Sequence, residues 1–200
     1  MLKALFYFAL LVTPPLTQAE LRVAFVEVFH SDGKRVELEP GDRFAHVAIS
    51  YRGQWLHAYP TRGVILSKDL SAFGKLGEIL GSKEAPELDD AWVRSIIGYP
   101  YDFDFRWDSD DRLYCSELVA KGMANSKGLQ LYPTPMTFLG SGWSPAQRTA
   151  MGHPGLSPDE IYDILRSRGW TLSGCPELFQ NVKSDSLPEG RPSLVSKPNR

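Results

Sequence analysis

The chain has 200 residues, a formal net charge of −2 at pH 7, 42% hydrophobic and 12% aromatic residues, and only two cysteines. This composition is typical of a packed globular protein and excludes a largely disordered chain. Two cysteines are too few for a disulfide-stapled scaffold, and the interspersed charges form no basic stripe, so we expect no nucleic-acid partner.

The first 19 residues have the pattern of a secretory signal peptide. Lys3 precedes an apolar run over residues 4–12, and two prolines and a small-residue cleavage site ending at Ala19 follow. The run is too short to span a bilayer, and no later segment approaches about 18 uninterrupted apolar residues. We therefore predict an exported protein, periplasmic or extracellular, without stable membrane insertion of the mature chain.

The rest of the chain divides into a domain over residues 20–181 and a tail over 182–200. The tail is rich in Ser, Pro, Lys and Arg, which is typical of disorder. In the first half of the domain, alternation of apolar residues and turn signals predict strands at 21–29, 44–51, 54–59, 63–67 and 76–80, with a loop at 71–75.

Helical spacing takes over in the second half. A helix carrying Leu88 and Ile96 is predicted after Pro86, with Gly98 as its stop, and a second over residues 113–124 with Asp110 or Asp111 as N-cap. A third begins at Ser157, where Pro158 and Glu160 complete a capping-box pattern. Strands first and helices later predict an α+β domain.

Two histidines fall at matching positions of a predicted hairpin. If Arg52 and Gly53 form a two-residue turn, one face carries His46, Ala48, Trp55, His57 and Tyr59, and the other carries Val47, Ile49, Leu56 and Ala58. The second set is wholly apolar, which supports the register and brings the two imidazoles within reach of each other. A three-residue loop would instead place the histidines on opposite faces.

Cys115 falls in the first turn of the second predicted helix. Unpaired N–H groups and the positive end of the helix dipole favour a thiolate there, whereas nearby acids oppose it, so an imidazole partner is needed. His46 is the natural base and His57 the residue that orients it. The alternative is that Cys115 belongs to an apolar stripe and fills the core.

The remaining cysteine and histidines have weaker claims to a role. His30 and His153 lie in predicted loops, and the four histidines with Cys115 match no zinc-ligand spacing, so we expect no metal and no cofactor. Cys175 is either a free thiol or, in an oxidising compartment, a disulfide partner of Cys115, which would leave a binding domain without thiol chemistry.

Five short segments carry a family resemblance: PGD at 40–42, FAHVAISY at 44–51, WLHA at 55–58, GYPYD at 98–102 and YCSELV at 114–119. Together they resemble the circularly permuted branch of the NlpC papain-like superfamily, especially its YiiX/YebB-like bacterial group, and more distantly the lecithin retinol acyltransferase relatives. In that branch the histidine strand precedes the cysteine helix, as it does here. The resemblance covers roughly residues 37–124 and extends weakly to residues 157–159.

The resemblance implies a permuted papain-like fold, in which an antiparallel sheet packs against helices and the nucleophile stands at a helix N-terminus. It implies Cys115 as nucleophile, His46 as general base and His57 as the polar third residue. Tyr101 matches an aromatic position that lines the site or donates to the oxyanion, with the backbone N–H of Cys115 as a second donor. Glu117 belongs to the signature and is a further candidate for a role at the substrate.

The function expected from these observations is that of an exported cysteine hydrolase. It would cleave an amide bond through a Cys-His-His mechanism with a thioester intermediate. Family and compartment point to a cell-envelope substrate, such as a peptidoglycan stem peptide or a related γ-glutamyl or D-amino-acid amide. The alternatives are an acyl-chain amide or ester hydrolase or acyltransferase, and a non-catalytic envelope binding domain. The oligomeric state is left open.

Overall fold

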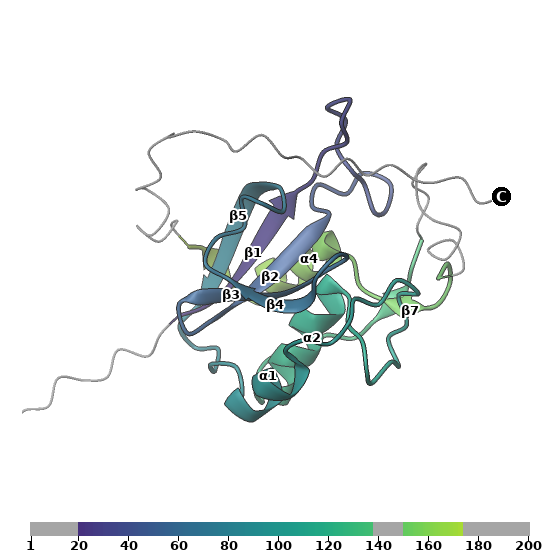
Figure 1. Ribbon diagram of the computed structural model, residues 1–200. Coiled ribbons are helices and arrows are strands. Elements are labelled where there is room, and N and C mark those ends of the chain that lie inside the picture. Colours follow the sequence, from purple (N-terminus) through teal and green to yellow (C-terminus); the bar gives the residue numbers. More distant parts are fainter. Residues whose placement is uncertain (1–19, 138–149, 174–200) are drawn as a thin grey trace, which may run out of the picture.

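The computed structural model describes residues 20–137 and 150–173, where helices pack against an antiparallel sheet (Figure 1). The predicted signal peptide and the tail at 182–200 lie outside the described residues, as does Cys175. Within them, none of the helices has the length and apolar character needed to cross a membrane.

The sheet has six strands in the order β4-β3-β2-β1-β5-β8, all antiparallel to their neighbours. Its members are β1 Leu21–Glu27, β2 His46–Tyr51, β3 Gln54–Tyr59, β4 Gly63–Ser67, β5 Lys75–Ser82 and β8 Thr171–Leu172. The five predicted strands are thus confirmed, with shifts of one or two residues at some ends. The short β8 and a two-stranded pair, β6 Thr134–Pro135 with β7 Pro154–Gly155, were not expected from the sequence.

The hairpin register is confirmed. Arg52 and Gly53 have φ of 48° and 74°, the positive values that a two-residue hairpin turn requires, and Tyr51 pairs with Gln54. A positive φ is strained for a residue other than glycine, such as Arg52. The Arg52 side chain binds Asp90, which lies after β5 in the chain. Paired backbone positions between β2 and β3 run from this turn only as far as Ile49 opposite Leu56.

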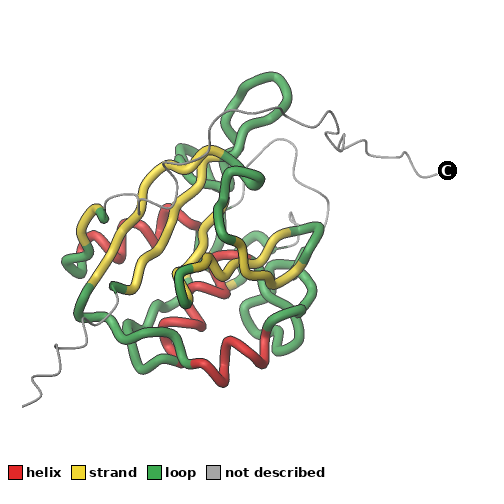
Figure 2. The backbone as a smooth tube through the Cα atoms, turned by 60° about the vertical axis from the view of Figure 1, so that its left-hand side comes forward, coloured by secondary structure: helices red, strands yellow, loops and turns green. Residues whose placement is uncertain are grey.

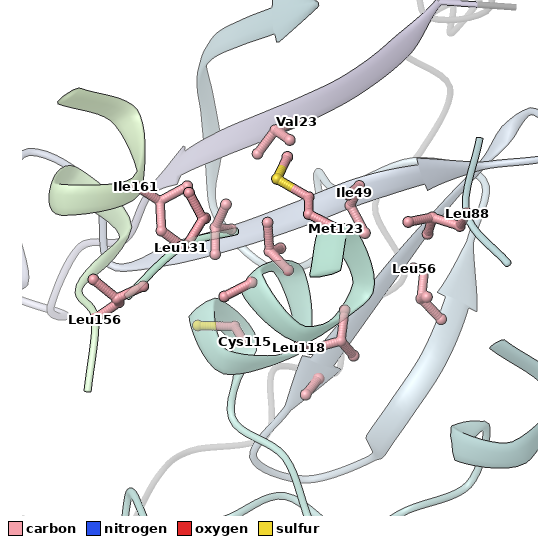
Figure 3. Packing of buried hydrophobic residues seen from close by; sticks show 14 of the residues in the cluster. Val23, Ile49, Leu56, Leu88, Cys115, Leu118, Met123, Leu131, Leu156 and Ile161 are labelled. Carbon is pink, nitrogen blue, oxygen red and sulfur yellow. The ribbon is translucent and has the colours of Figure 1, made fainter. Parts of the chain in front are cut away.

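The two faces of the sheet are covered differently. The face that carries Val47, Ile49, Leu56 and Ala58 packs against α1, α2 and α4 in the main core. Figure 2 shows the strands in yellow lying against the helices in red, and Figure 3 shows the buried side chains of α2 among those of β1 to β3. The opposite face carries Ala48 and Trp55 and is covered by Leu70 and Phe73 from the loop between β4 and β5.

Helix α1 spans Asp90–Ile96, and its N-cap is Asp89, whose carboxylate accepts a hydrogen bond from the Trp92 N–H at 2.7 Å. The sequence predicted a helix directly after Pro86 that includes Leu88, and this start was wrong, because the Asp89 cap begins the helix later. Gly98, with φ of 88°, follows the helix as predicted.

Helix α2 spans Cys115–Asn125, and Tyr114 is its N-cap. The prediction that the helix begins at Leu113, capped by Asp110 or Asp111, was wrong. Leu113 is held extended, because its N–H donates to the Pro100 carbonyl at 3.2 Å and its own carbonyl accepts the Asp102 N–H at 3.1 Å. Because these two hydrogen bonds keep Leu113 out of the helix, Cys115 is the first helical residue.

Helix α4 spans Pro158–Ser167 and begins with the predicted capping box of Ser157 and Glu160. Its Asp159 carboxylate reaches back to the segment before β2, where it accepts the N–H of Arg43 at 2.9 Å and of Phe44 at 2.7 Å. The start of α4 therefore fixes the approach of the chain to His46.

The segment between α1 and α2 is attached to the edge strand β4. The Val64 N–H donates to the Tyr99 carbonyl at 2.8 Å, and the Gly98 N–H donates to the Val64 carbonyl at 2.9 Å. Gly63 has φ of 67°, and a Cβ at that position would collide with the Tyr99 carbonyl oxygen. The close approach therefore requires glycine.

Candidate active site

Cys115 is a free thiol at the N-terminus of α2, where Figure 3 shows it at the start of the helix. Two residues further along the helix, the Glu117 carboxyl group accepts a hydrogen bond from the Tyr114 N–H at 3.4 Å and lies 2.8 Å from the Lys121 side-chain nitrogen. The Ser116 hydroxyl donates to the Leu156 carbonyl at 2.6 Å, which ties the helix start to the chain before α4. Several polar contacts therefore fix the position of the sulfur.

The thiol of Cys115 is neutral at physiological pH. Its burial raises the pKa to about 11, even though the backbone N–H groups of Val47, Ser116 and Cys115 itself lower it. The helix N-terminus thus acts in the expected direction, but desolvation is the larger effect. As the sequence suggested, the helix alone does not supply a thiolate.

His46 and His57 share one face of the hairpin, as predicted, and their rings meet. Nε2 of His46 lies 2.9 Å from Nδ1 of His57, and Nε2 of His57 lies 2.9 Å from the Ser67 hydroxyl on β4. The Phe73 ring packs edge-on against His57, with centroids 4.5 Å apart, and covers the pair from outside. Both histidines are buried, so this geometry is held by packing as well as by hydrogen bonds.

Both imidazoles are neutral near pH 7. Burial, followed by the charge of His57, lowers the pKa of His46 to about 3, and burial, followed by the charge of Arg62, lowers that of His57 to about 4. A neutral ring donates from one nitrogen and accepts at the other. If His46 donates from Nε2 to His57, and His57 donates from Nε2 to Ser67, then Nδ1 of His46 is the free acceptor.

Cys115 and His46 meet at a cavity of about 160 Å³ at the end of the sheet where β2 begins and β3 ends. They approach it from different sides, since Cys115 belongs to the helix-covered core and the histidines to the opposite face. In the part of the chain that the structure describes, no hydrogen bond joins the sulfur to the His46 ring. The backbone N–H of Val47, next to His46, is a donor toward the sulfur.

Tyr101 and Glu117, the two weaker candidates, have different locations. Tyr101 lines the cavity, and burial, followed by the nearby Cys115, raises the pKa of its hydroxyl well above the ordinary value, so it is a proton donor at neutral pH. Glu117 is fully buried but does not line the cavity; its carboxyl group caps α2 and lies beside Lys121. The structure thus brings Tyr101 to the cysteine and gives Glu117 a structural position.

His30 and His153 are exposed and do not line this cavity. Ser67 is the contact that the sequence reasoning missed. Trp55 pairs with Ser67 and His57 with Ile65, so extending the pairing arithmetic by one strand would have placed Ser67 on the histidine face.

Three comparisons with known proteins identify chains that are similar to this one. A family model described as "Permuted papain-like amidase enzyme, YaeF/YiiX, C92 family" matches residues 86–141, which include the cysteine helix. The YiiX protein of Escherichia coli K12, which is uncharacterised, is 54% identical over 39 residues. That match covers 20% of this chain and 19% of the relative, so it spans about a fifth of each.

A solved structure extends the likeness to most of the chain. The crystal structure of the metalloprotein yiiX from Escherichia coli O157:H7 aligns with a TM-score of 0.56, covering 79% of this chain and 97% of that one at 22% identity. At this identity the likeness concerns the fold. The expected α+β permuted papain-like fold and the family resemblance are both confirmed.

Proposed function

We propose that this chain is a permuted papain-like cysteine amidase in which Cys115 is the nucleophile and His46 the base. The observation that carries the proposal is that both side chains line one cavity, while Nε2 of His46 is occupied by His57. This leaves Nδ1 of His46 as the nitrogen available to the thiol, and the general class of cysteine amidase agrees with the family that the cysteine region matches.

The proposed reaction has two halves. First, Nδ1 of His46 takes the thiol proton while the sulfur of Cys115 attacks the amide carbon. The resulting oxyanion is stabilised by the Tyr101 hydroxyl and the backbone N–H of Cys115. The C–N bond then breaks, and His46 returns the proton to the leaving amine, so that a thioester remains.

Water completes the cycle. His46 takes a proton from a water molecule while the water oxygen attacks the thioester carbon. The C–S bond then breaks, and His46 returns the proton to the sulfur of Cys115. The products are an amine and a carboxylic acid, and the enzyme is regenerated. Because the thiol and the imidazole are both neutral at rest, proton transfer accompanies attack, and a standing ion pair is not required.

The relative with the aligned structure is described as a metalloprotein. In residues 20–137 and 150–173 of this chain, no three His, Cys, Asp or Glu side chains gather as metal ligands. The facing nitrogens of the two buried histidines are engaged with each other. The described residues therefore do not fit a metal site, and we assign each step to side chains.

We propose a cell-envelope amide as the substrate, with the enzyme acting after export. The support is the signal-peptide pattern of residues 1–19, together with β1 beginning at Leu21, so that cleavage after Ala19 would remove none of the described elements. Mass spectrometry of the protein recovered from a periplasmic fraction should give an N-terminus at Glu20. Recovery of the intact chain from the cytoplasm would contradict export.

The activity can be tested by mass spectrometry of envelope digests treated with the wild-type protein, Cys115→Ser and His46→Ala. Release of a new amine and a new carboxylate is expected from the wild type, with a loss of at least about 100-fold in both variants. His153→Ala, at an exposed histidine, is the matched control and should remain active. Equal amounts of product from the wild type and Cys115→Ser would refute the amidase. Binding of envelope fragments to the protein without their cleavage would instead indicate a binding domain.

A further inference from the structure

The wall of the cavity beside Cys115 carries no formal charge at neutral pH. Among the described residues, no Asp, Glu, Lys or Arg side chain lines it. Apart from His46, Cys115 and Ser116, its wall is aliphatic or aromatic, with Val36, Leu38 and Leu156 among its members. Tyr101 and Tyr114 also line it, and burial raises the pKa of both hydroxyls well above the ordinary value, so they too are uncharged.

The size of the cavity sets a second limit. Its volume is about 160 Å³. An apolar protein cavity of roughly 150 Å³ accommodates a molecule such as benzene. A group of about six carbon atoms therefore fits beside the sulfur, whereas most of a long fatty chain would have to lie outside.

The acyl part of the substrate is the part that must fit. After the amine has left, the acyl group remains bonded to the Cys115 sulfur as the thioester, and it stays there until water attacks. A carboxylate carried into this cavity would lose its hydration and find no cationic side chain on the wall, which is costly. An apolar group would instead gain from burial.

We infer that the enzyme takes amides whose acyl group is small, uncharged and apolar, of about six carbon atoms or one aromatic ring. This inference rests on the proposed amidase function and narrows its substrate class. It separates the two substrate classes expected from the sequence, because a γ-glutamyl donor brings a free carboxylate to the sulfur and an apolar acyl amide does not.

The test is a series of coumarin anilides that share one leaving group and differ only in the acyl chain. The series contains hexanoyl, phenylacetyl, the neutral but polar glutaramoyl, the charged glutaryl, γ-glutamyl and palmitoyl. We expect kcat/KM for hexanoyl and phenylacetyl to exceed that for glutaryl and γ-glutamyl by at least about 30-fold, with glutaramoyl between them. Palmitoyl should be cleaved more slowly than hexanoyl at concentrations below micelle formation.

Variants of the wall connect this selectivity to the cavity. Val36→Phe narrows the cavity and should lower kcat/KM for hexanoyl several-fold more than for an acetyl anilide. Ile164→Phe, a substitution at a half-buried residue of α4 that does not line the cavity, is the control and should leave the ratio unchanged. An unchanged ratio in Val36→Phe would contradict the assignment of the acyl group to this cavity.

Labelling of Cys115 separates this inference from the amidase proposal. N-butyl iodoacetamide should alkylate Cys115 at least about tenfold faster, relative to free cysteine, than iodoacetate, measured by intact mass and peptide mapping. Selective labelling without hydrolysis of any anilide would refute the amidase but support the apolar site. Cleavage of glutaryl or γ-glutamyl anilides as fast as hexanoyl would support the amidase and overturn the inference.

Discussion

Ser67 is the residue on which the orientation of the histidine pair depends. Its hydroxyl lies 2.9 Å from Nε2 of His57, and an acceptor there leaves Nδ1 of His57 without a proton. If Nε2 of His46 then donates to that nitrogen, Nδ1 of His46 is left free for the role of base that we propose. Ser67 does not line the cavity, so we propose it as a positioning residue.

Ser67→Ala should lower kcat about fivefold, the equivalent of one lost hydrogen bond, with little change in KM. The other tautomer of His57 becomes accessible, so the pH dependence of kcat should also change. Ser67→Thr, which keeps the hydroxyl, should restore most of the activity. Ser95→Ala, at an exposed serine of α1, is the control. A purely structural role would instead lower thermal stability without moving the pH profile.

At this scale the sequence predicted the positions of the candidate residues better than it predicted their electrostatics. The shared face of His46 and His57 and the position of Cys115 at a helix start could be predicted, because strand parity and helix position follow from local rules. The raised pKa of the thiol could not, since it arises from burial by segments distant in the chain. Ser67 was missed because the pairing arithmetic ended at β3.

At the scale of elements, the start of α4 supports the approach to β2. Asp159 accepts two backbone N–H groups there, and both donors lie within three residues of His46. Asp159→Ala should therefore lower the free energy of unfolding by about 2 kcal/mol, measured by urea denaturation. Asp163→Ala, at an exposed residue of the same helix, should change it by less than about 0.5 kcal/mol. Equal losses in both variants would contradict this role.

The start of a helix can be predicted from the sequence when neighbouring residues form its cap, but not when a contact with a distant segment determines it. The capping box at Ser157 was predicted because all of its members lie within four residues. The start of α2 was misplaced because it depends on Leu113 pairing with the chain beside Tyr101, more than ten residues earlier. A potential cap such as Asp110 is ineffective where a tertiary bridge holds the chain extended.

At the scale of the whole molecule, two buried acids make folding depend on pH. Burial raises the pKa of Glu117 from 4.5 to about 8, opposed by Lys121, and that of Asp42 from 3.8 to about 7. At a pH between the ordinary and the raised pKa of each group, the carboxyl is protonated in the folded chain and ionised in the unfolded chain. Their contribution to stability is therefore lost as pH rises, by up to about 1.4 kcal/mol per unit for each group.

We expect the temperature of the thermal unfolding midpoint to decrease as the pH rises from about 5 to about 8. Glu117→Gln, which resembles the protonated carboxyl, should flatten this dependence, while Asp42 retains its own share. Glu87→Gln, at an exposed glutamate, is the matched control and should follow the wild type. A slope in Glu117→Gln equal to that of the wild type would show that the carboxyl is already ionised in the folded chain.

The overall sheet was predictable in part. Alternation identified five of its strands, because each pattern is local. The placement of β1 between β2 and β5, and the addition of β8 at the edge, depend on pairings across tens of residues. The α+β class followed from the order of elements, whereas the spatial order of the strands did not.

Gly63 links the edge of the sheet to the chemistry proposed for its end. A methyl group there would meet the Tyr99 carbonyl, which lies two residues before Tyr101 in the wall of the cavity. Natural variation at position 63 should therefore be constrained together with the segment at 98–102, although the glycine itself does not line the cavity. In directed evolution of this chain, position 63 would be intolerant to substitution for reasons that a map of cavity-lining residues would not reveal.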